Sequence, residues 1–369
     1  MISMTVFNGN EYLAGLSFVW LPSFLLLGSS LLFKKNIINR LNILAVLLGI
    51  SAAISTHTAT IMLSYSTYIN LQFCIISYIL VSSIILSDDS FKAIIKFYVN
   101  FGFIICLILL FNYIFSVGVY EFSEGNIRVT IKYFGISKDV NYLSAFIIPT
   151  FAYYLFIGCF TKNKLSLIKA GVVFYAVFIA GSRAAFLAML LSAMIIILKL
   201  IFEKKQNVNK YAVIMLLIIS VFFSYFLISK SAIFTRTTDF ENYTRNARIS
   251  IWMHALDGFY MKPIWGSGVE SGSYYSLLYT RWKTHSCFID ILVGQGVVGI
   301  IIIAAMFIEY RKVNKKNKTF LTSMLICFFV PLFFLNGYEC ATFWVPMMLV
   351  RFIYIKCKEH ANIVLLLTK

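Results

Sequence analysis

Charged residues are scarce in this chain. Asp, Glu, Lys and Arg together make up 13% of its 369 residues, whereas 60% are hydrophobic. This balance excludes an ordinary soluble domain. The seven Cys show no CxxC spacing and the four His show no HxxxH spacing. Neither a disulfide framework nor a metal site is therefore predicted.

Nucleotide-binding motifs are also missing. No Gly-rich loop follows a predicted strand, and the apolar chain leaves no room for a soluble α/β domain. We therefore expect no cofactor, and the energy for any reaction must come with the substrate. The first apolar run has neither a basic flank nor a small-residue cleavage site, so we interpret it as a retained helix and not as a signal peptide.

Long apolar runs dominate the sequence. A hydrocarbon core of about 30 Å is crossed by about 20 apolar residues in a helix. Eleven such runs are centred near residues 22, 47, 77, 105, 150, 174, 193, 220, 297, 328 and 349. Backbone groups in lipid must satisfy their own hydrogen bonds, so these runs are helices. We predict an all-α polytopic membrane protein with about eleven transmembrane helices (10–12), whose residues 1–369 form a single integral membrane domain.

Lys and Arg are unevenly distributed among the loops. Twenty of them lie in the C-terminal tail and in the loops 34–40, 87–96, 161–169, 199–210 and 308–318. The alternate loops 56–67 and 336–341 carry none. Basic short loops stay in the cytoplasm, which predicts an outer N-terminus, an inner C-terminus and an extracytoplasmic loop over 230–284. The net charge of +17 thus reflects topology, and we predict no nucleic-acid partner.

The predicted extracytoplasmic loop 230–284 is the longest polar stretch in the chain. It contains more cations than acids: Lys230, Arg236, Arg245, Arg248, Lys262, Arg281 and Lys283 against Asp239, Glu241, Asp257 and Glu270. Within it, five apolar residues share one helical stripe: Ile249, Trp252, Met253, Leu256 and Tyr260. This spacing predicts an amphipathic helix over 249–260 that lies on the membrane surface.

Three motifs in residues 165–310 carry a resemblance. They are Gly181-Ser182-Arg183-Ala184-Ala185; Arg248 and Trp252 followed by Lys262-Pro263-Ile264-Trp265-Gly266-Ser267-Gly268; and His285 followed by Gln295-Gly296 and Gly299. In this order the chain resembles the O-antigen ligase and O-antigen polymerase family of bacterial surface-polysaccharide assembly. The resemblance implies a GT-C-like architecture. It also implies a metal-independent inverting glycosyltransferase that takes glycan from undecaprenyl diphosphate at the periplasmic face of the inner membrane.

The resemblance also gives roles to particular residues. His285 takes the position of a catalytic base, a task that suits imidazole because it titrates near neutral pH; the structural alternative is an interfacial anchor or helix cap. Arg183 and Arg248 are expected to bind the diphosphate, because a guanidinium binds phosphate with two donors and stays charged. Snorkelling or lipid headgroup contact is the alternative for both. Arg245 is a further candidate, for which headgroup contact is favoured.

Other polar residues are possible members of the site. Asp290 lies in the helix after His285. An ionisable side chain within a membrane helix is costly, so we expect it to have a partner or a function. Glu339 and Arg351 either pair with each other or contact substrate. For His254 we favour a solvated surface role. For Pro263, Gly266 and Gly268 the structural role of shaping a turn is favoured over ligand binding.

The preferred function is an O-antigen polymerase whose partners are an undecaprenyl-diphosphate-linked oligosaccharide, membrane lipid and a chain-length-regulating membrane protein. An O-antigen ligase, with lipid A-core as acceptor, is the close alternative. No outer-loop Arg is followed eleven positions later by Gly, and Gln295 replaces an acidic residue, which leaves this choice open. A flippase would need ionisable residues near the midplane of several helices, and the helices before residue 180 carry almost none. A scaffold would leave the cations of loop 230–284 without a role.

Overall fold

The computed structural model describes residues 39–59, 65–84, 86–117, 119–121, 127–133, 136–137, 139–202, 245–280 and 282–368. They divide into two compact units. Unit 1 draws on Met1–Phe91, Arg245–Val313 and Leu332–Glu359, and unit 2 on Lys92–Thr244, Asn314–Pro331 and His360–Lys369. Each unit is assembled from segments far apart in sequence, so each depends on long-range helix packing.

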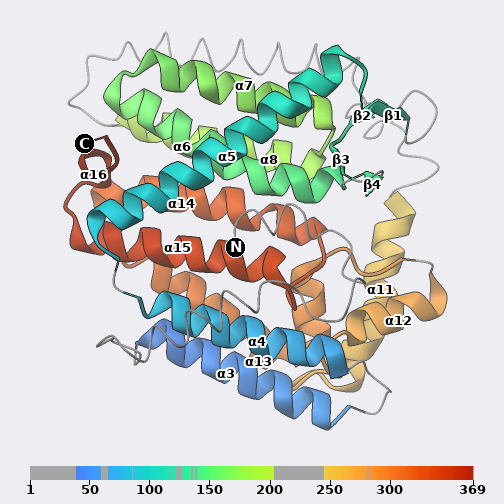
Figure 1. Ribbon diagram of the computed structural model, residues 1–369. Helices are drawn as coiled ribbons and strands as arrows, with labels where there is room; N and C mark the ends of the chain where they lie inside the picture. Colours follow the sequence, from blue (N-terminus) through green and yellow to red (C-terminus); the bar gives the residue numbers. More distant parts are fainter. Residues whose placement is uncertain are drawn as a thin grey trace. The chain divides into compact units, whose positions relative to one another are not determined.

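Unit 1 is a helical bundle (Figure 1). Its elements are α3 (Arg40–His57), α4 (Tyr65–Ser82), α11 (Arg245–Met261), α12 (Ser271–Tyr279), α13 (Cys287–Tyr310), α15 (Ala341–Glu359) and the 3₁₀ helix η1 (Pro331–Phe334), which starts at the unit boundary. Helix α13 packs against α3, α11, α12 and α15, while α4 packs against α3 and α15. The long apolar helix α13 is therefore the element that connects the short helices α11 and α12 to the bundle.

Unit 2 is also mainly helical. It contains most of α5 (Asp88–Ile114), then α6 (Val140–Thr161), α7 (Lys164–Ala180), α8 (Arg183–Phe202), α14 (Lys315–Phe329) and α16 (Ile363–Thr368). Between α5 and α6 lie two small antiparallel hairpins, β1 (Val119–Glu121) with β2 (Ile127–Val129) and β3 (Lys132–Tyr133) with β4 (Ile136–Ser137). The prediction of an all-α chain holds for the described residues apart from these hairpins.

Six of the described helical segments are long and apolar enough to cross a membrane. They are Arg40–His57, Asp88–Ile114, Val140–Thr161, Arg183–Phe202, Cys287–Tyr310 and Lys315–Phe334. The predicted runs centred near residues 22 and 220 lie outside the described residues, and each of the other predicted centres falls in or at the end of a helix. Large apolar side chains such as Phe97 and Ile104 of α5 are more than half exposed, as expected for lipid-facing positions. The protein is a multi-pass helical membrane protein.

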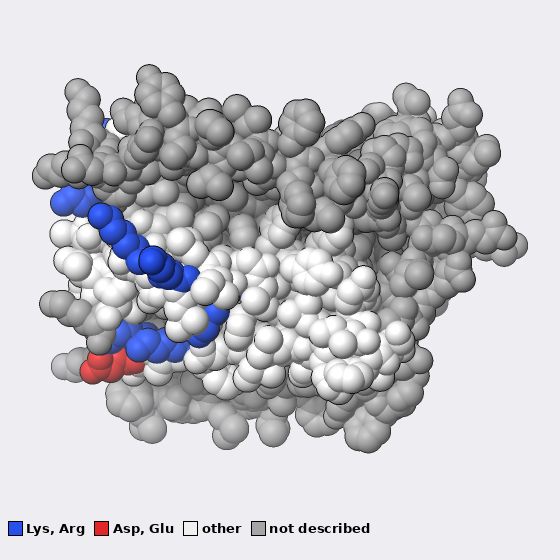
Figure 2. All heavy atoms as spheres, turned by 90° about the horizontal axis from the view of Figure 1, so that it is seen from above, with Lys and Arg blue, Asp and Glu red and all other residues white. Residues whose placement is uncertain are grey.

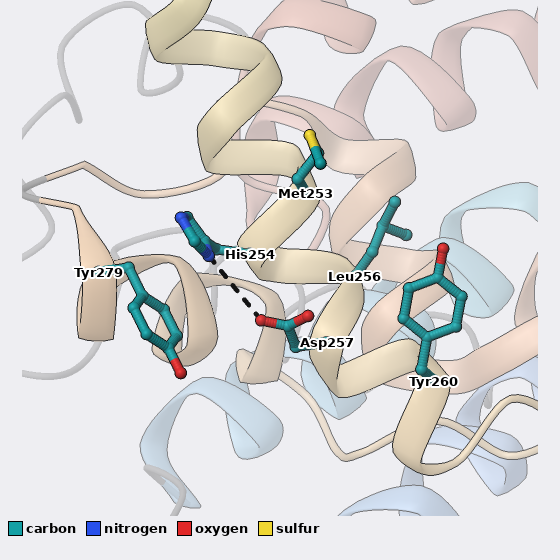
Figure 3. A pocket seen from close by; sticks show the side chains of 6 residues that line it. All are labelled: Met253, His254, Leu256, Asp257, Tyr260 and Tyr279. Carbon is teal, nitrogen blue, oxygen red and sulfur yellow. Dashed lines mark ion pairs between the residues drawn. The ribbon is translucent and has the colours of Figure 1, made fainter.

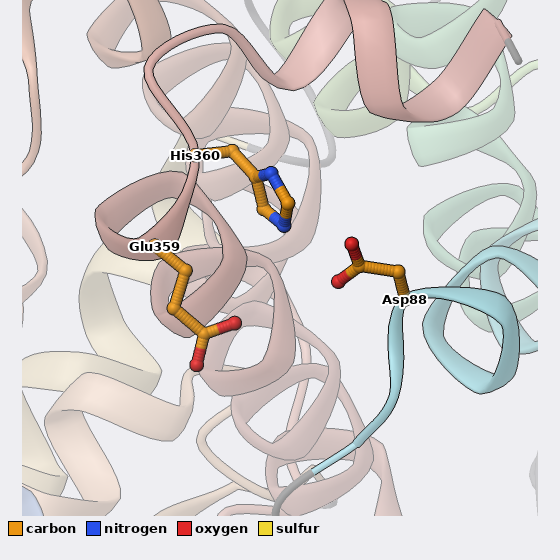
Figure 4. A group of neighbouring side chains, drawn as sticks. All are labelled: Asp88, Glu359 and His360. Carbon is orange, nitrogen blue, oxygen red and sulfur yellow. The ribbon is translucent and has the colours of Figure 1, made fainter.

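One end of unit 1 gathers loops that were predicted to lie in the cytoplasm; we call it the basic end. Glu309 at the end of α13 pairs with Arg40 and Lys312 at 3.9 and 2.6 Å. Lys356 of α15 donates to the carboxylates of Asp88 and Glu359 at 2.9 and 2.7 Å. Figure 4 shows these two carboxylates with His360 near them. Loops that are separate in sequence but alike in charge thus meet at one end.

The opposite end of unit 1 gathers the segments predicted to be extracytoplasmic; we call it the histidine end, because it includes His285. The hydroxyl of Thr56 accepts from the backbone N–H of Val269 at 3.2 Å, and that of Thr67 donates to Glu270 at 2.8 Å. Lys262 donates to the carbonyl of Thr58. The loops rich in Lys and Arg and the loops without them therefore lie at opposite ends of unit 1.

Unit 2 also gathers basic residues at one set of helix ends. Exposed Lys162 and Lys164 lie between α6 and α7, and Lys199 lies in the last turn of α8. The connection at the other ends of α7 and α8 is only Gly181 and Ser182. In Figure 2, described Lys and Arg side chains gather on the left half of the face, and the described surface to the right shows none. This asymmetry supports the predicted orientation.

Candidate functional site

His285 stands two residues before the start of α13 in a strained backbone conformation. Its φ is +50°, a left-handed value that few residues other than Gly adopt. The cap of α13 is Ser286, whose side chain accepts from the backbone N–H of Ile289 at 3.4 Å. His285 is therefore not the helix cap that its structural alternative proposed. Backbone strain of this kind concentrates at functional sites, which supports a role for the side chain.

Thr284 connects the backbone beside His285 to a buried acid. Its hydroxyl donates to the carboxylate of Asp290 at 2.6 Å and lies 3.3 Å from the amide oxygen of Asn336. Thr284 is fully buried and Asp290 is 4% exposed. The missing partner of Asp290 is thus Thr284, which sequence reasoning overlooked although it directly precedes His285. This contact fixes the segment that carries His285.

Helix α11 reaches the same segment from the other side. The indole N–H of Trp252 donates to the carbonyl of Thr284 at 2.8 Å. One turn earlier, the guanidinium of Arg248 lies 5.5 Å from the ring centre of Phe334 in η1. The residues after η1 in turn hold the start of α13, where Leu335 accepts from the N–H of Cys287 at 2.7 Å. Arg248 and His285 therefore border the same part of unit 1. Arg245 is the first residue of α11, and its side chain lies outside the described residues.

Helix α11 is amphipathic in a way the sequence predicted only in part. Ile249, Met253 and Tyr260 of the predicted apolar stripe are 52%, 63% and 71% exposed. The opposite face is also apolar, and its Ala255 is fully buried in a core cluster with Tyr275 and Val293. The helix therefore rests on α12 and α13 through Ala255, and Leu256 of the stripe also packs against this cluster. Contact of the exposed stripe residues with the membrane surface stays a prediction.

The motif from Lys262 to Gly268 inserts into a break in α13. At Gly296 the helix backbone turns to φ +66°. The carbonyls of Val293 and Gly294 accept from the N–H groups of Ser267 and Gly268 at 2.9 and 3.1 Å.

On the other side of the break, the N–H groups of Val297 and Val298 donate to the carbonyls of Pro263 and Ile264 at 2.9 and 3.2 Å. A broken membrane helix is tolerated only where its freed backbone groups find partners, and this motif provides them. The structural role predicted for Pro263, Gly266 and Gly268 is confirmed.

At Gly296 the backbone of α13 lies very close to the backbone of the motif Lys262–Gly268. A side chain at this position would place its Cβ 2.3 Å from the carbonyl oxygen of Ile264. The neighbouring Gln295 is fully buried, and its amide donates to the hydroxyl of Tyr338 at 3.3 Å. Burial raises the pKa of Tyr338 well above its usual range, so the phenol stays neutral and can accept this bond. Gln295 therefore has a structural partner in the described part of unit 1.

Arg183 is the first residue of α8 in unit 2. Helix α7 ends at Gly181, whose φ of +71° allows the chain to turn within two residues. Ser182 is 1% exposed, and its hydroxyl has no hydrogen-bond partner in the structure. A helix N-terminus with a guanidinium and a buried hydroxyl is suited to an anion, because the helix dipole and the N–H groups both favour negative charge.

Of the two alternatives for Glu339 and Arg351, the structure does not fit a pairing with each other, and the substrate role stays a prediction. Arg351 is the eleventh residue of α15. The part of α15 that precedes it is about 15 Å long, and Glu339 lies before the start of that helix. Its guanidinium instead lies 5.4 Å from the ring centre of Tyr354. Glu339 lies in the turn before α15, where its carbonyl accepts from the thiol of Cys74 at 3.8 Å. Glu339 belongs to the histidine end, and Arg351 lies within the bundle.

Comparison with known proteins adds one finding. Residues 170–304 match the family described as O-Antigen ligase. No curated protein matches the chain. The matched segment begins in α7 and ends in α13, so it contains Arg183, Arg248, His285 and Asp290, whereas Glu339 and Arg351 lie beyond it. Residues 170–304 of this membrane protein are therefore similar to the O-antigen ligase family, in the part of the chain that carries the motifs noted in the sequence.

Proposed function

We propose that the protein is an O-antigen polymerase with a GT-C-like architecture. It transfers a growing glycan from undecaprenyl diphosphate to the non-reducing end of a lipid-linked repeat unit, at the periplasmic face of the bacterial inner membrane. The observation that carries this proposal is the strained position of His285 at the histidine end, fixed through Thr284 to Asp290 and bordered by Arg248. The O-antigen ligase family match over residues 170–304 supports the same type of reaction.

His285 is the proposed general base. The hydroxyl oxygen of the acceptor sugar attacks the anomeric carbon of the donor, and its proton passes to the imidazole. The bond between the anomeric carbon and the diphosphate oxygen breaks, and its electron pair leaves with undecaprenyl diphosphate. Attack from the side opposite the leaving group inverts the anomeric carbon. A positioned base contributes about 10²–10⁴-fold to such a step.

Arg183 and Arg248 are the proposed diphosphate ligands. A leaving diphosphate gains negative charge in the transition state, and donors that are already in place stabilise that charge without reorganisation. Two guanidinium groups supply this charge stabilisation in a metal-independent mechanism. Arg245, which starts the same helix as Arg248, is a weaker candidate for contact with the diphosphate or with a lipid headgroup.

Ligation to lipid A-core is the second candidate function, and the description of the matched family favours it. The two functions share donor and chemistry but differ in acceptor. Deletion of the gene separates them through the surface polysaccharide that remains. A single repeat unit on the lipid A-core indicates a polymerase, whereas polymer that accumulates on the carrier with none on the core indicates a ligase. An unchanged polysaccharide ladder contradicts both.

A further inference from the structure

The described surface of unit 1 has a pocket outside the proposed catalytic residues. It lies between α11 and α12 and has a volume of about 400 Å³, within the range of small-molecule sites. Its lining combines apolar and polar side chains: Met253, His254, Leu256, Asp257, Tyr260 and Tyr279 (Figure 3). Met253, Leu256 and Tyr260 belong to the apolar stripe predicted from the sequence, whereas His254, Asp257 and Tyr279 do not.

Two parallel rings form one wall of the pocket. The imidazole of His254 stacks on the phenol ring of Tyr279, with ring centres 4.4 Å apart and an angle of 18°. Tyr279 is nevertheless 65% exposed, so much of its surface is open to a ligand. The carboxylate of Asp257 lies 3.9 Å from Nδ1 of His254. Figure 3 shows Tyr279 across from His254 and Asp257. Sequence reasoning assigned His254 to solvent, but the structure gives it this aromatic partner.

We propose that this pocket binds a pyranose ring of the glycan substrate, an inference that rests on the proposed glycosyltransferase function. A pyranose has a face of C–H groups, which packs against the electron-rich face of an aromatic ring. Its edge carries hydroxyl groups, for which a carboxylate is an acceptor and a phenol both donor and acceptor. Tyr279 provides the ring, while Asp257 and the hydroxyl of Tyr260 provide the polar partners.

The charge of the pocket favours a neutral saccharide over other ligands. Among the described residues its lining includes an acid and no Lys or Arg, so a phosphate group would meet the carboxylate of Asp257 at close range. An acyl chain would bury the carboxylate of Asp257, which is costly because its partner His254, at 3.9 Å, lies beyond hydrogen-bond distance. A polyhydroxylated ligand bonds to the acid and covers the apolar side chains at the same time.

The pocket is also within reach of His285. Tyr279 precedes His285 by six residues, so the two lie no more than about 20 Å apart. Between them stands Trp282, which is 59% exposed and whose ring centre lies 6.2 Å from that of His285. An oligosaccharide that has one ring in the pocket can therefore pass Trp282 and present a distal sugar at His285.

Saccharide binding to the full-length protein in lipid nanodiscs tests this inference. The probe is the oligosaccharide repeat released by mild acid from the surface polysaccharide of a strain that carries the gene, and dextran is the negative control. We expect Tyr279→Ala and Asp257→Asn each to weaken binding about tenfold, as expected for loss of a ring contact or of a hydrogen bond to a charged group. Tyr279→Phe keeps the ring and most of the affinity. Tyr274→Ala, on an exposed tyrosine of α12 outside the pocket, leaves binding unchanged.

Kinetics with the same variants separate this inference from the proposed function. For Tyr279→Ala we expect a higher KM for the lipid-linked saccharide and an unchanged turnover rate at saturation. Wild-type affinity in both Tyr279→Ala and Asp257→Asn overturns the saccharide site, as does protection of Tyr279 by lipid and not by saccharide. If Tyr279→Ala weakens binding while His285→Ala keeps full turnover, the subsite stands and the proposed base is wrong.

Discussion

The two ends of unit 1 are both polar, but different contacts hold them together. At the basic end, Glu309 and Lys356 are each bonded to two or more groups of opposite charge. At the histidine end, hydroxyl and backbone groups make most of the described contacts, and the ion pair of Lys283 with Glu270 is long, at 3.7 Å. Charge at the basic end is neutralised internally, whereas the histidine end combines backbone strain with fixed polar groups. This difference agrees with the proposal that the histidine end carries the catalytic residues and the basic end a structural role.

The largest expected effect is on the accessibility of the two ends to a membrane-impermeant thiol reagent. Leu278→Cys should be labelled from outside the cytoplasmic membrane, because Leu278 is 56% exposed in α12. Asn314→Cys, exposed before α14, should be labelled only after lysis. Ser273, also in α12, is 5% exposed and would react poorly. Labelling of Asn314→Cys and not Leu278→Cys in intact cells inverts the proposed orientation.

Removal of single cations should distinguish the proposed diphosphate ligands from the structural ion pairs. Arg183→Ala and Arg248→Ala should each lower polymerisation about ten- to a hundredfold, because a hydrogen bond to a charged group contributes about 1.5–3 kcal/mol. Lys in either position should restore activity only in part, since it lacks the planar fork of donors. Activity is measured in membranes at matched protein abundance.

Lys312→Ala is the control at the basic end. Its ion pair with Glu309 involves a side chain that is 49% exposed, and pairs of this kind contribute at most about 1 kcal/mol. Activity should therefore stay within about twofold of wild type. Wild-type activity in Arg183→Ala or Arg248→Ala removes that arginine from the proposed site.

The break in α13 should matter for stability more than for chemistry. Gly296→Ala should destabilise the protein by about 1–3 kcal/mol from the left-handed backbone alone, with a further cost from the contact with Ile264. Gly171→Ala in α7 is the matched control, because its new Cβ meets no atom within 4 Å; helix propensity should make it neutral or slightly stabilising. Thermal unfolding in detergent measures both, and equal midpoints for the two variants contradict the proposed role of the break.

Loss of the contact between Thr284 and Asp290 should have the smallest effect on activity. Thr284→Val keeps the shape but removes the hydroxyl that donates to Asp290, and Asp290→Asn keeps an acceptor. We expect a lower turnover rate with little change in KM for Thr284→Val, and a milder loss for Asp290→Asn. A change confined to KM would mean that the contact positions substrate and not His285.

The sequence predicts the helices well, because lipid requires each long apolar run to form its own hydrogen bonds. The sequence also predicts the boundary between α7 and α8 at Gly181, where the backbone has a left-handed conformation. The break in α13 is not predictable from its own segment, since nothing there distinguishes Gly296 from the neighbouring Gly294 and Gly299. Its partners are the carbonyls of residues 263 and 264, more than thirty positions earlier.

In the candidate site, too, some residues could be predicted from the sequence and others could not. His285 and Arg248 could be found from motifs, because their side-chain chemistry suits the reaction. Thr284 could not, because its role depends on Asp290, whose hydrogen bond forms only when the chain turns at His285. A pairing of Glu339 with Arg351 does not form, because about 15 Å of helix lies between them, and their opposite charges alone do not reveal this distance. Sequence therefore identifies reactive groups more readily than the contacts that position them.

The most direct test of the central claim is polymer formation by His285→Gln with purified lipid-linked repeat units. Gln can hydrogen-bond a sugar hydroxyl but cannot accept its proton, so we expect activity to fall by about 10²–10⁴-fold. His57→Ala, on a histidine of α3, should be tolerated. Polymerisation by His285→Gln at near the wild-type rate would contradict the assignment of His285 as the base.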